Sequence, residues 1–189
     1  MVNFLLYIQK LITKIMNGFV FNAYVRMVEE DFGINVINYV MENSSLKSGG
    51  EYTSVDSYDY REIIKMNKTL ATYTSIPGKQ LMNAFGVYFF RLMKSREDFS
   101  NLNKPEDFID RFVEFIQNNS VTKSREDENP EIKIDLSDKL ILVKLKAEKE
   151  MIWFMEKTVA EISKMYNFIQ QGYNKFINKE EKTIAVARI

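Results

Sequence analysis

The spacing of apolar residues in this chain changes near Pro130, and this change constrains the fold more than any other feature. In residues 105–117, Phe108, Phe112 and Phe115 recur three or four positions apart, which is typical of one face of a helix. From Ile132 onward, apolar and charged residues alternate, as in a strand with one buried face. We therefore expect an α+β fold, in which an N-terminal helical lobe precedes a lobe with a small antiparallel sheet and a packed helix.

The same spacing predicts the individual elements. Helices are expected over 17–32, 34–41, about 60–73, 79–93, 105–117 and 151–169. Gly33 suits the end of the first helix, and Pro105 suits the first turn of the fifth. Strands are expected over 132–136, 140–145 and 182–189, with a short one at 173–177. The polar stretch 118–129 between the fifth helix and the first strand is expected to be a solvated loop.

Residues 2–15 carry Phe4, Ile8, Leu11 and Ile15 at helical spacing, which predicts an N-terminal extension helix over 1–15. Lys10 and Lys14 interrupt the apolar run, so it is too short to span a bilayer. A signal peptide is not expected, because no basic leader precedes the run. An alternative interpretation is a peripheral helix that lies on a membrane surface or against a partner protein.

Composition excludes several classes of function. The 189 residues contain neither histidine nor cysteine, so Ser-His and Cys-His catalysis, thiolate ligation and most zinc sites are excluded, and no metal site is predicted. Basic and acidic residues balance at 26 each, so we expect no nucleic-acid partner. The absence of cysteine fits a reducing interior, and we expect a cytoplasmic protein. With no catalytic constellation, an enzyme is not predicted.

The order of several segments resembles the haem nitric-oxide/oxygen binding (H-NOX) family of gas-sensing domains. Met16-Asn17-Gly18 opens a helix as in that family, and 85–90 (Phe-Gly-Val-Tyr-Phe-Phe) looks like the family's Phe-Gly-x-Tyr helix. The helix ending near Gln117, with a proline about a dozen residues later, looks like the helix that ligates haem. The resemblance implies an H-NOX-like domain over 16–189, with a helical lobe at about 16–75 and a helix-plus-sheet lobe at about 76–189.

The departures from the family concern haem itself. Gln117 stands at the position where the family supplies a histidine to the haem iron, and no histidine exists elsewhere in the chain. The family's Tyr-x-Ser-x-Arg motif for the haem propionates is matched by Leu145, Ala147 and Lys149. Both hydroxyls are absent, and the bidentate guanidinium is replaced by a point charge. We therefore predict no haem cofactor of the usual, histidine-ligated kind.

The resemblance also places a ligand pocket between the helices. Tyr24 and Phe89 best match distal-side residues, and the Tyr24 hydroxyl would orient a ligand in an apolar surrounding. The alternative is that aromatic side chains fill the space that haem would occupy. The predicted lining residues are Val20, Tyr24, Phe85, Phe89, Phe112 and Phe154.

Three functions stay open at this point. The first is a haem-free sensory or regulatory domain that holds another small apolar ligand. The second is a haem-based gas sensor with a tyrosine or methionine ligand. The third is a ligand-free protein-interaction module. In each case the resemblance implies a signalling protein, such as a kinase or a cyclase, as the partner. The tyrosine-rich segment 52–60 is a further candidate recognition surface, although such rings more often cover a core.

Overall fold

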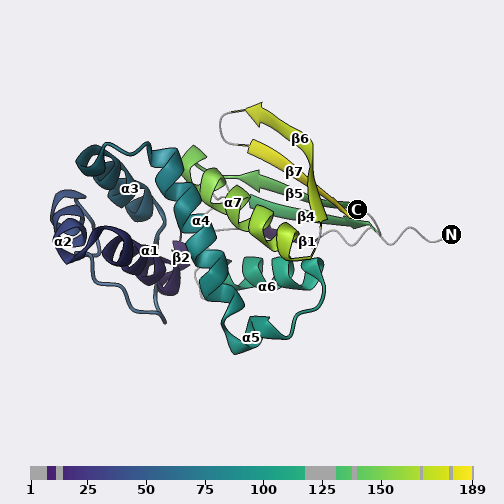
Figure 1. Ribbon diagram of the computed structural model, residues 1–189, viewed down its shortest axis with the longest axis horizontal. Coiled ribbons are helices and arrows are strands. Elements are labelled where there is room, and N and C mark those ends of the chain that lie inside the picture. Colours follow the sequence, from purple (N-terminus) through teal and green to yellow (C-terminus); the bar gives the residue numbers. More distant parts are fainter. Residues whose placement is uncertain are drawn as a thin grey trace.

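The structure is a computed structural model and describes residues 8–11, 15–117, 131–137, 140–166, 168–178 and 181–188. Side chains are described over 16–116, except 105, 106, 113 and 114, and over 147–166. The predicted loop 118–129 and residues 2–7 lie outside the described residues. Figure 1 shows a helical end, a central pair of neighbouring helices and a twisted sheet at the opposite end.

The helical end contains α1 (Gly18–Phe32), α2 (Ile34–Asn43) and α3 (Arg61–Thr74). Asn17 caps α1, because its Oδ1 accepts a hydrogen bond of 2.8 Å from the Phe19 amide. Gly33 separates α1 from α2 at φ 91°, a conformation that glycine adopts without the penalty of a Cβ. Asp59 accepts a hydrogen bond of 3.0 Å from the Arg61 amide at the start of α3. The ends of α1 agree with the prediction to within one residue, whereas α2 ends at Asn43, two residues beyond the predicted end.

The centre contains α4 (Gly78–Lys94). The chain then continues through the short helix α5 (Glu97–Ser100) into α6 (Pro105–Gln117). The bounds of α6 are those that the sequence predicts. Phe108, Ile109, Phe112 and Ile116 of α6 are each at most 1% exposed, so the predicted apolar face is the buried face.

The sheet is antiparallel and has the strand order β1-β4-β5-β7-β6. Ile134 of β4 faces Val143 of β5, which faces Ile184 of β7, so apolar residues continue across three strands in register. A separate ribbon pairs β2 with β3 beside the start of α1. The bounds are Ile8–Leu11 (β1), Ile15–Asn17 (β2), Ser57–Asp59 (β3), Glu131–Ser137 (β4), Leu140–Lys146 (β5), Phe168–Asn178 (β6) and Glu181–Arg188 (β7).

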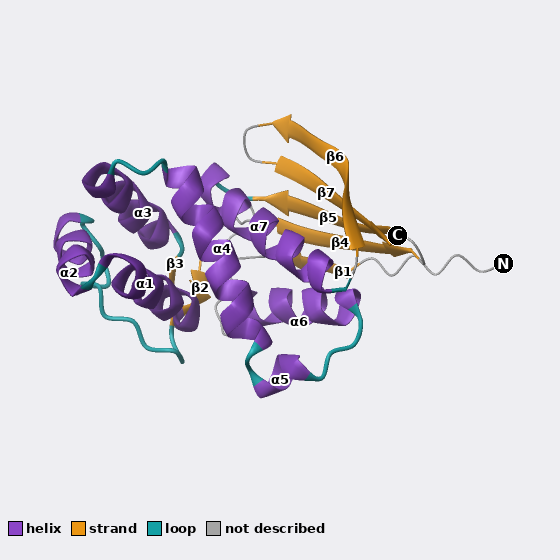
Figure 2. Ribbon diagram, viewed as in Figure 1, coloured by secondary structure: helices purple, strands orange, loops and turns teal. Residues whose placement is uncertain are grey.

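The last helix, α7 (Lys149–Met165), joins the two ends of the molecule. It packs along α4 on one side and contacts β5, β6 and β7 on the other. Figure 2 shows α7 beside α4, on the side of α4 that is nearer to the sheet. The observed order of a helical lobe, a packed helix and an antiparallel sheet confirms the α+β prediction.

Two predictions for elements were wrong. Residues 8–11 form a strand instead of part of an N-terminal helix, because they pair with β4 at the edge of the sheet and satisfy its open backbone groups. The helix predicted over 151–169 ends at Met165, and Phe168 and Ile169 belong to β6. That strand is longer than the predicted 173–177, because pairing with β7 starts at Phe168. In both cases long-range backbone pairing outweighs local helical spacing.

Candidate functional site

Five of the predicted pocket residues form one group of rings, here called the aromatic cluster: Tyr24, Phe85, Phe89, Phe112 and Phe154. Phe85 and Phe154 stack with ring centroids 4.6 Å apart and planes at 18°. Phe85 contacts Tyr24 edge to face at 5.1 Å, and Phe89 contacts Phe112 at 6.0 Å. Four helices supply these rings, so the cluster joins α1, α4, α6 and α7.

Burial of the cluster is nearly complete. Its members are at most 1% exposed, and the sixth predicted residue, Val20 of α1, is fully buried as well. Centroid separations between 4.6 and 6.0 Å are those of rings in direct contact. The observed positions therefore match the alternative interpretation, in which the rings pack against one another. Their role as the lining of a ligand site stays a prediction.

The hydroxyl of Tyr24 does not end in an apolar space. It donates a hydrogen bond of 3.3 Å to Oδ1 of Asn67 on α3, and Nδ2 of Asn67 donates one of 3.1 Å to the Gly78 carbonyl. Asn67 is 1% exposed. Burial raises the pKa of the Tyr24 phenol well above its ordinary value, so the neutral form is strongly favoured. The geometry gives Tyr24 a fixed partner inside the helical lobe.

A close crossing of α4 and α7 depends on Gly86, the glycine of the Phe-Gly-Val-Tyr segment. A Cβ at Gly86 would lie 2.8 Å from both the Phe154 carbonyl oxygen and Cβ of Lys157. Thr158 closes the contact, since its Oγ1 donates to the Phe154 carbonyl at 2.9 Å and lies 3.4 Å from the Gly86 carbonyl. The absence of a side chain at Gly86 is what allows Phe85 and Phe154 to stack.

The position at which the family resemblance places the haem ligand is the end of α6. Gln117 is the last residue of α6, and its side chain lies outside the described residues. Two residues earlier, the Phe115 ring meets the Phe19 ring at 5.1 Å, and the Arg96 guanidinium lies 4.7 Å from the Phe115 centroid and 5.1 Å from that of Phe19. This cation–π contact ties the end of α6 to the start of α1.

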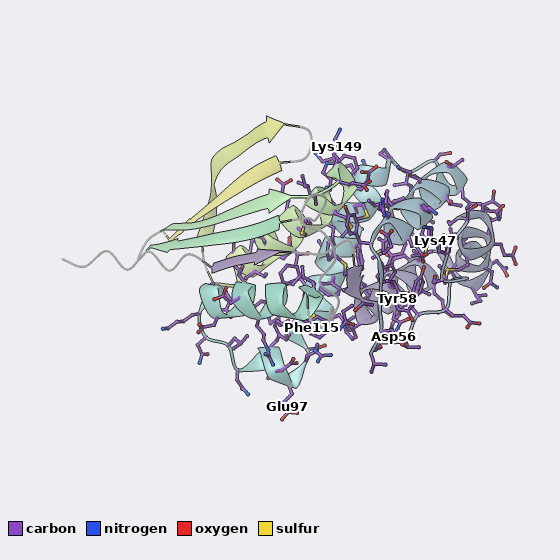
Figure 3. The ribbon with its side chains drawn as sticks, turned by 180° about the vertical axis from the view of Figure 1, so that it is seen from behind. Lys47, Asp56, Tyr58, Glu97, Phe115 and Lys149 are labelled. Carbon is purple, nitrogen blue, oxygen red and sulfur yellow. The ribbon has the colours of Figure 1, made fainter. Side chains whose placement is uncertain are left out.

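The segment matching the propionate motif leads into α7. Ala147 is buried, and Lys149 is exposed with its Nζ 5.3 Å from the Trp153 ring centroid. Figure 3 places Lys149 at the upper edge of the helices and away from Phe115. Leu145 belongs to β5, and its side chain lies outside the described residues. Neither Ala147 nor Leu145 offers a hydroxyl to a carboxylate.

The tyrosine-rich segment 52–60 is organised by one buried carboxylate, Glu62. Its Oε2 accepts hydrogen bonds from the Ser48 hydroxyl at 2.6 Å and the Tyr52 hydroxyl at 2.9 Å, and its Oε1 accepts from the Lys47 and Ser48 amides at 2.8 and 3.1 Å. Burial favours the neutral acid, but these hydrogen bonds outweigh it and hold the pKa of Glu62 below its ordinary value. Tyr52 in turn stacks on Phe21, so this segment covers the core.

An open groove of about 260 Å³ lies between α4 and α7 on the surface. Its lining is dominated by charged side chains, so it does not have the character expected of an apolar ligand site. The lining residues are Lys79, Asn83, Glu156, Lys157, Ala160 and Lys164.

Sequence patterns did not identify Arg96, Asn67 or Glu62 as organising residues. Asn67 and Glu62 carry a weak signal, because they are polar residues at positions of α3 whose helical neighbours are apolar. Arg96 carries none, because its two ring partners come from segments far away in the sequence.

The chain belongs to the haem-NO-binding family, since the family's model matches residues 17–171. Solved H-NOX structures share its fold. The Fe(II) unliganded H-NOX protein from K. algicida has a TM-score of 0.70 at 17% identity, covering 92% of this chain and 97% of that one. The IWP-051-bound H-NOX from Shewanella woodyi, in the Fe(II)CO state, has a TM-score of 0.64 at 21% identity, covering 91% and 94%.

The H-NOX protein from S. oneidensis in the Fe(II)NO state has a TM-score of 0.64 at 20% identity, covering 90% of this chain and 98% of that one. No curated protein matches the chain. Identities this low establish the shared fold and leave the ligand to be argued from the residues themselves.

The residues of this chain do not fit a histidine-ligated haem. The complete sequence has no imidazole, and the side chains at the pocket positions are in ring contact with each other. Within the described ranges, no group of three or more acidic side chains could hold a metal ion. In the same part of the chain, no helix is long and apolar enough to cross a membrane.

Proposed function

We propose that this chain is a sensory or regulatory domain of the H-NOX type that works without haem and without a catalytic step of its own. The observation that carries the proposal is the donor set at the family's haem positions. The chain has no imidazole to offer the iron and, at the propionate motif, no hydroxyl and no guanidinium. Family membership supports the sensory part, and the missing donors support the haem-independent part.

The aromatic cluster supports one kind of ligand for such a domain. The rings of Phe85, Phe89 and Phe154 are within 4.6 to 5.8 Å of one another by centroid distance, so a ligand enters only by displacing a ring. The only polar group described for the cluster is the Tyr24 hydroxyl, which already has Asn67 as a partner. These features favour a small apolar molecule over one with charged groups.

Haem held by tyrosine or methionine is the second candidate, and the surroundings of Tyr24 argue against it. A tyrosinate ligand requires loss of the phenol proton, whereas burial raises the pKa of Tyr24. The proposed partner is a signalling protein, such as a kinase or a cyclase, whose activity changes with the state of the domain.

Native mass spectrometry of the full chain, produced in cells supplied with haem precursor, tests the proposal. We expect the mass of the bare chain, or of the chain with a small non-porphyrin molecule. The K. algicida H-NOX protein, prepared in parallel, is the positive control for haem loading. A stoichiometric porphyrin adduct on this chain would overturn the proposal.

A further inference from the structure

The aromatic cluster is connected to the surface of the protein through one further ring, Phe19 of α1. Phe19 meets Phe89 of the cluster edge to face at 6.2 Å by centroid distance, and it meets Phe115 of α6 at 5.1 Å with planes at 88°. Phe89 in turn contacts Phe154 at 5.4 Å. Ring contacts therefore lead from the buried stack to the place where the start of α1 meets the end of α6.

Arg96 occupies the angle between the perpendicular rings of Phe19 and Phe115. Its guanidinium carbon lies 5.1 Å from the Phe19 centroid and 4.7 Å from the Phe115 centroid. The two centroids are themselves 5.1 Å apart, so the three groups form a nearly regular triangle, here called the clasp. A cation is attracted to a ring within about 6 Å of its centroid, so Arg96 gains from both rings only while they stay together.

The backbone of Arg96 is fixed independently of the two rings. Its amide donates to the Met93 carbonyl at 3.0 Å, and its carbonyl accepts from the Phe99 and Ser100 amides at 3.1 and 2.9 Å. Its Nε donates to Oδ1 of Asp98 at 3.0 Å. Arg96 is therefore held at the corner between α4 and α5, whereas its ring partners belong to α1 and α6.

The charged end of the clasp lies at the surface. The side chains of Arg96 and Asp98 are 35% and 31% exposed, and together with Glu97 they line a hollow open to solvent. Figure 3 shows Phe115 at the end of α6 that faces the helical lobe. A movement of Phe19 would therefore change the surroundings of a guanidinium that a partner protein can reach.

We propose that the clasp senses whether the aromatic cluster holds a ligand. This inference rests on the proposed function, in which a small apolar molecule enters by displacing a ring of the cluster. Phe89 contacts three other rings of the cluster as well as Phe19, so a displaced ring moves Phe19 through Phe89. Arg96 then keeps one ring partner, and the start of α1 loosens from the end of α6. Because coupling between two sites is reciprocal, opening the clasp by mutation favours ligand binding.

The first test needs no ligand. Phe89→Leu removes the ring that supports Phe19, and Phe90→Leu is the matched control, because Phe90 is the next residue of α4 and its ring contacts Phe108 at 5.8 Å. Proton–nitrogen NMR of the full chain follows the Nε–H signal of Arg96, which is assigned by its loss in Arg96→Gln. We expect this signal to shift toward the position of a solvated arginine in Phe89→Leu and to stay in place in Phe90→Leu. An unmoved signal in Phe89→Leu, or equal shifts in both variants, would overturn the proposal.

The second test uses hexafluorobenzene, a one-ring apolar probe whose electron-poor face stacks on the electron-rich face of phenylalanine. Titration followed by fluorine NMR gives its dissociation constant for the full chain and for Arg96→Gln. We expect about two- to fivefold tighter binding to Arg96→Gln, which is the factor that a partly exposed cation–π contact contributes to an equilibrium. Arg91→Gln, at an exposed arginine of α4, is the matched control and should bind like the wild type.

The titration separates failure of the clasp from failure of the ligand site. Saturable binding with equal affinity for the wild type and Arg96→Gln would overturn the sensing role of the clasp alone. Failure of hexafluorobenzene to bind any of the three proteins would contradict the apolar ligand site of the proposed function, and the sensing role would fall with it.

Discussion

The Phe85 and Phe154 rings stack 4.6 Å apart by centroid distance, and they come from α4 and α7 at the point where the two helices cross. This stack fills a position that the family resemblance assigns to a ligand pocket. It also ties the sheet to the helical lobe, because α7 contacts both α4 and the sheet.

Truncation of one ring of this stack should create an apolar cavity. Phe154→Ala is expected to lower the free energy of unfolding by about 3–5 kcal/mol, because a buried phenylalanine leaves a space that its neighbours fill only partly. Chemical denaturation measures this loss. Added benzene should raise the melting temperature of the variant more than that of the wild type, since a dry apolar cavity binds such molecules. Tyr39→Ala, at an exposed ring, is the control, and an equal benzene effect in all three proteins would contradict the assignment.

The crossing at Gly86 should not tolerate a methyl group. Alanine is favoured over glycine inside a helix by up to about 1 kcal/mol, so propensity alone predicts a more stable Gly86→Ala variant. The 2.8 Å approach of a Cβ to the Phe154 carbonyl predicts the opposite, a loss of about 1–3 kcal/mol as α4 and α7 are forced apart. Urea unfolding of Gly86→Ala distinguishes a gain from a loss of stability. A stabilised variant would show that α4 and α7 do not approach each other as closely as described.

Loss of the hydrogen bond between Tyr24 and Asn67 should lower the free energy of unfolding by a smaller amount. Tyr24→Phe keeps the ring contact with Phe85 but leaves the buried Asn67 Oδ1 without its donor, so we expect a loss of about 1 kcal/mol in unfolding free energy. Tyr39→Phe, which removes an exposed hydroxyl, is the matched control and should be close to neutral. A loss of the same size in both variants would mean that the buried hydrogen bond contributes nothing specific.

The lowered pKa of Glu62 implies that the stability of the protein depends on pH. Its pKa is lower in the folded protein than in the unfolded chain, so its contribution is fully present above the ordinary carboxyl range. The contribution should be lost as pH falls from about 4.3 through the lowered folded-state value. At pH 7 Glu62→Gln should be less stable by about 1–3 kcal/mol, because its amide would face groups that donate hydrogen bonds to the carboxylate.

The difference between Glu62→Gln and wild type should shrink as the pH is lowered below 4. Urea midpoints at a series of pH values measure it, with Glu42→Gln, at an exposed position of α2, as the control. If the difference in stability between wild type and Glu62→Gln stays constant down to pH 3, the ionised carboxylate is not what stabilises the segment around Tyr52.

The sequence was sufficient to predict the elements whose apolar spacing agrees with their final surroundings. Helix α6 is the clearest example, because Phe108, Phe112 and Ile116 repeat at helical spacing and are all buried. The sequence did not predict β1, because Ile8–Leu11 pairs with a strand more than a hundred residues away. Local spacing contains no information about such a partner.

The candidate site, too, was predictable from the sequence only in part. The aromatic residues of the predicted pocket were found from the family resemblance, and the structure brings five of the six into one cluster. The direction of the Tyr24 hydroxyl was not predictable, because it depends on Asn67, forty-three positions along the chain. The contact of Arg96 with Phe19 and Phe115 depends in the same way on segments that only the fold brings together.

The central claim, that this H-NOX-type chain works without haem, is tested most directly by an absorption spectrum. The purified full chain is mixed with equimolar haemin, reduced, and compared with a Gln117→His variant that restores an imidazole at the end of α6. We predict that the wild type keeps the broad spectrum of unbound haem. A sharp Soret band with a defined ferrous spectrum in the wild type would contradict the claim.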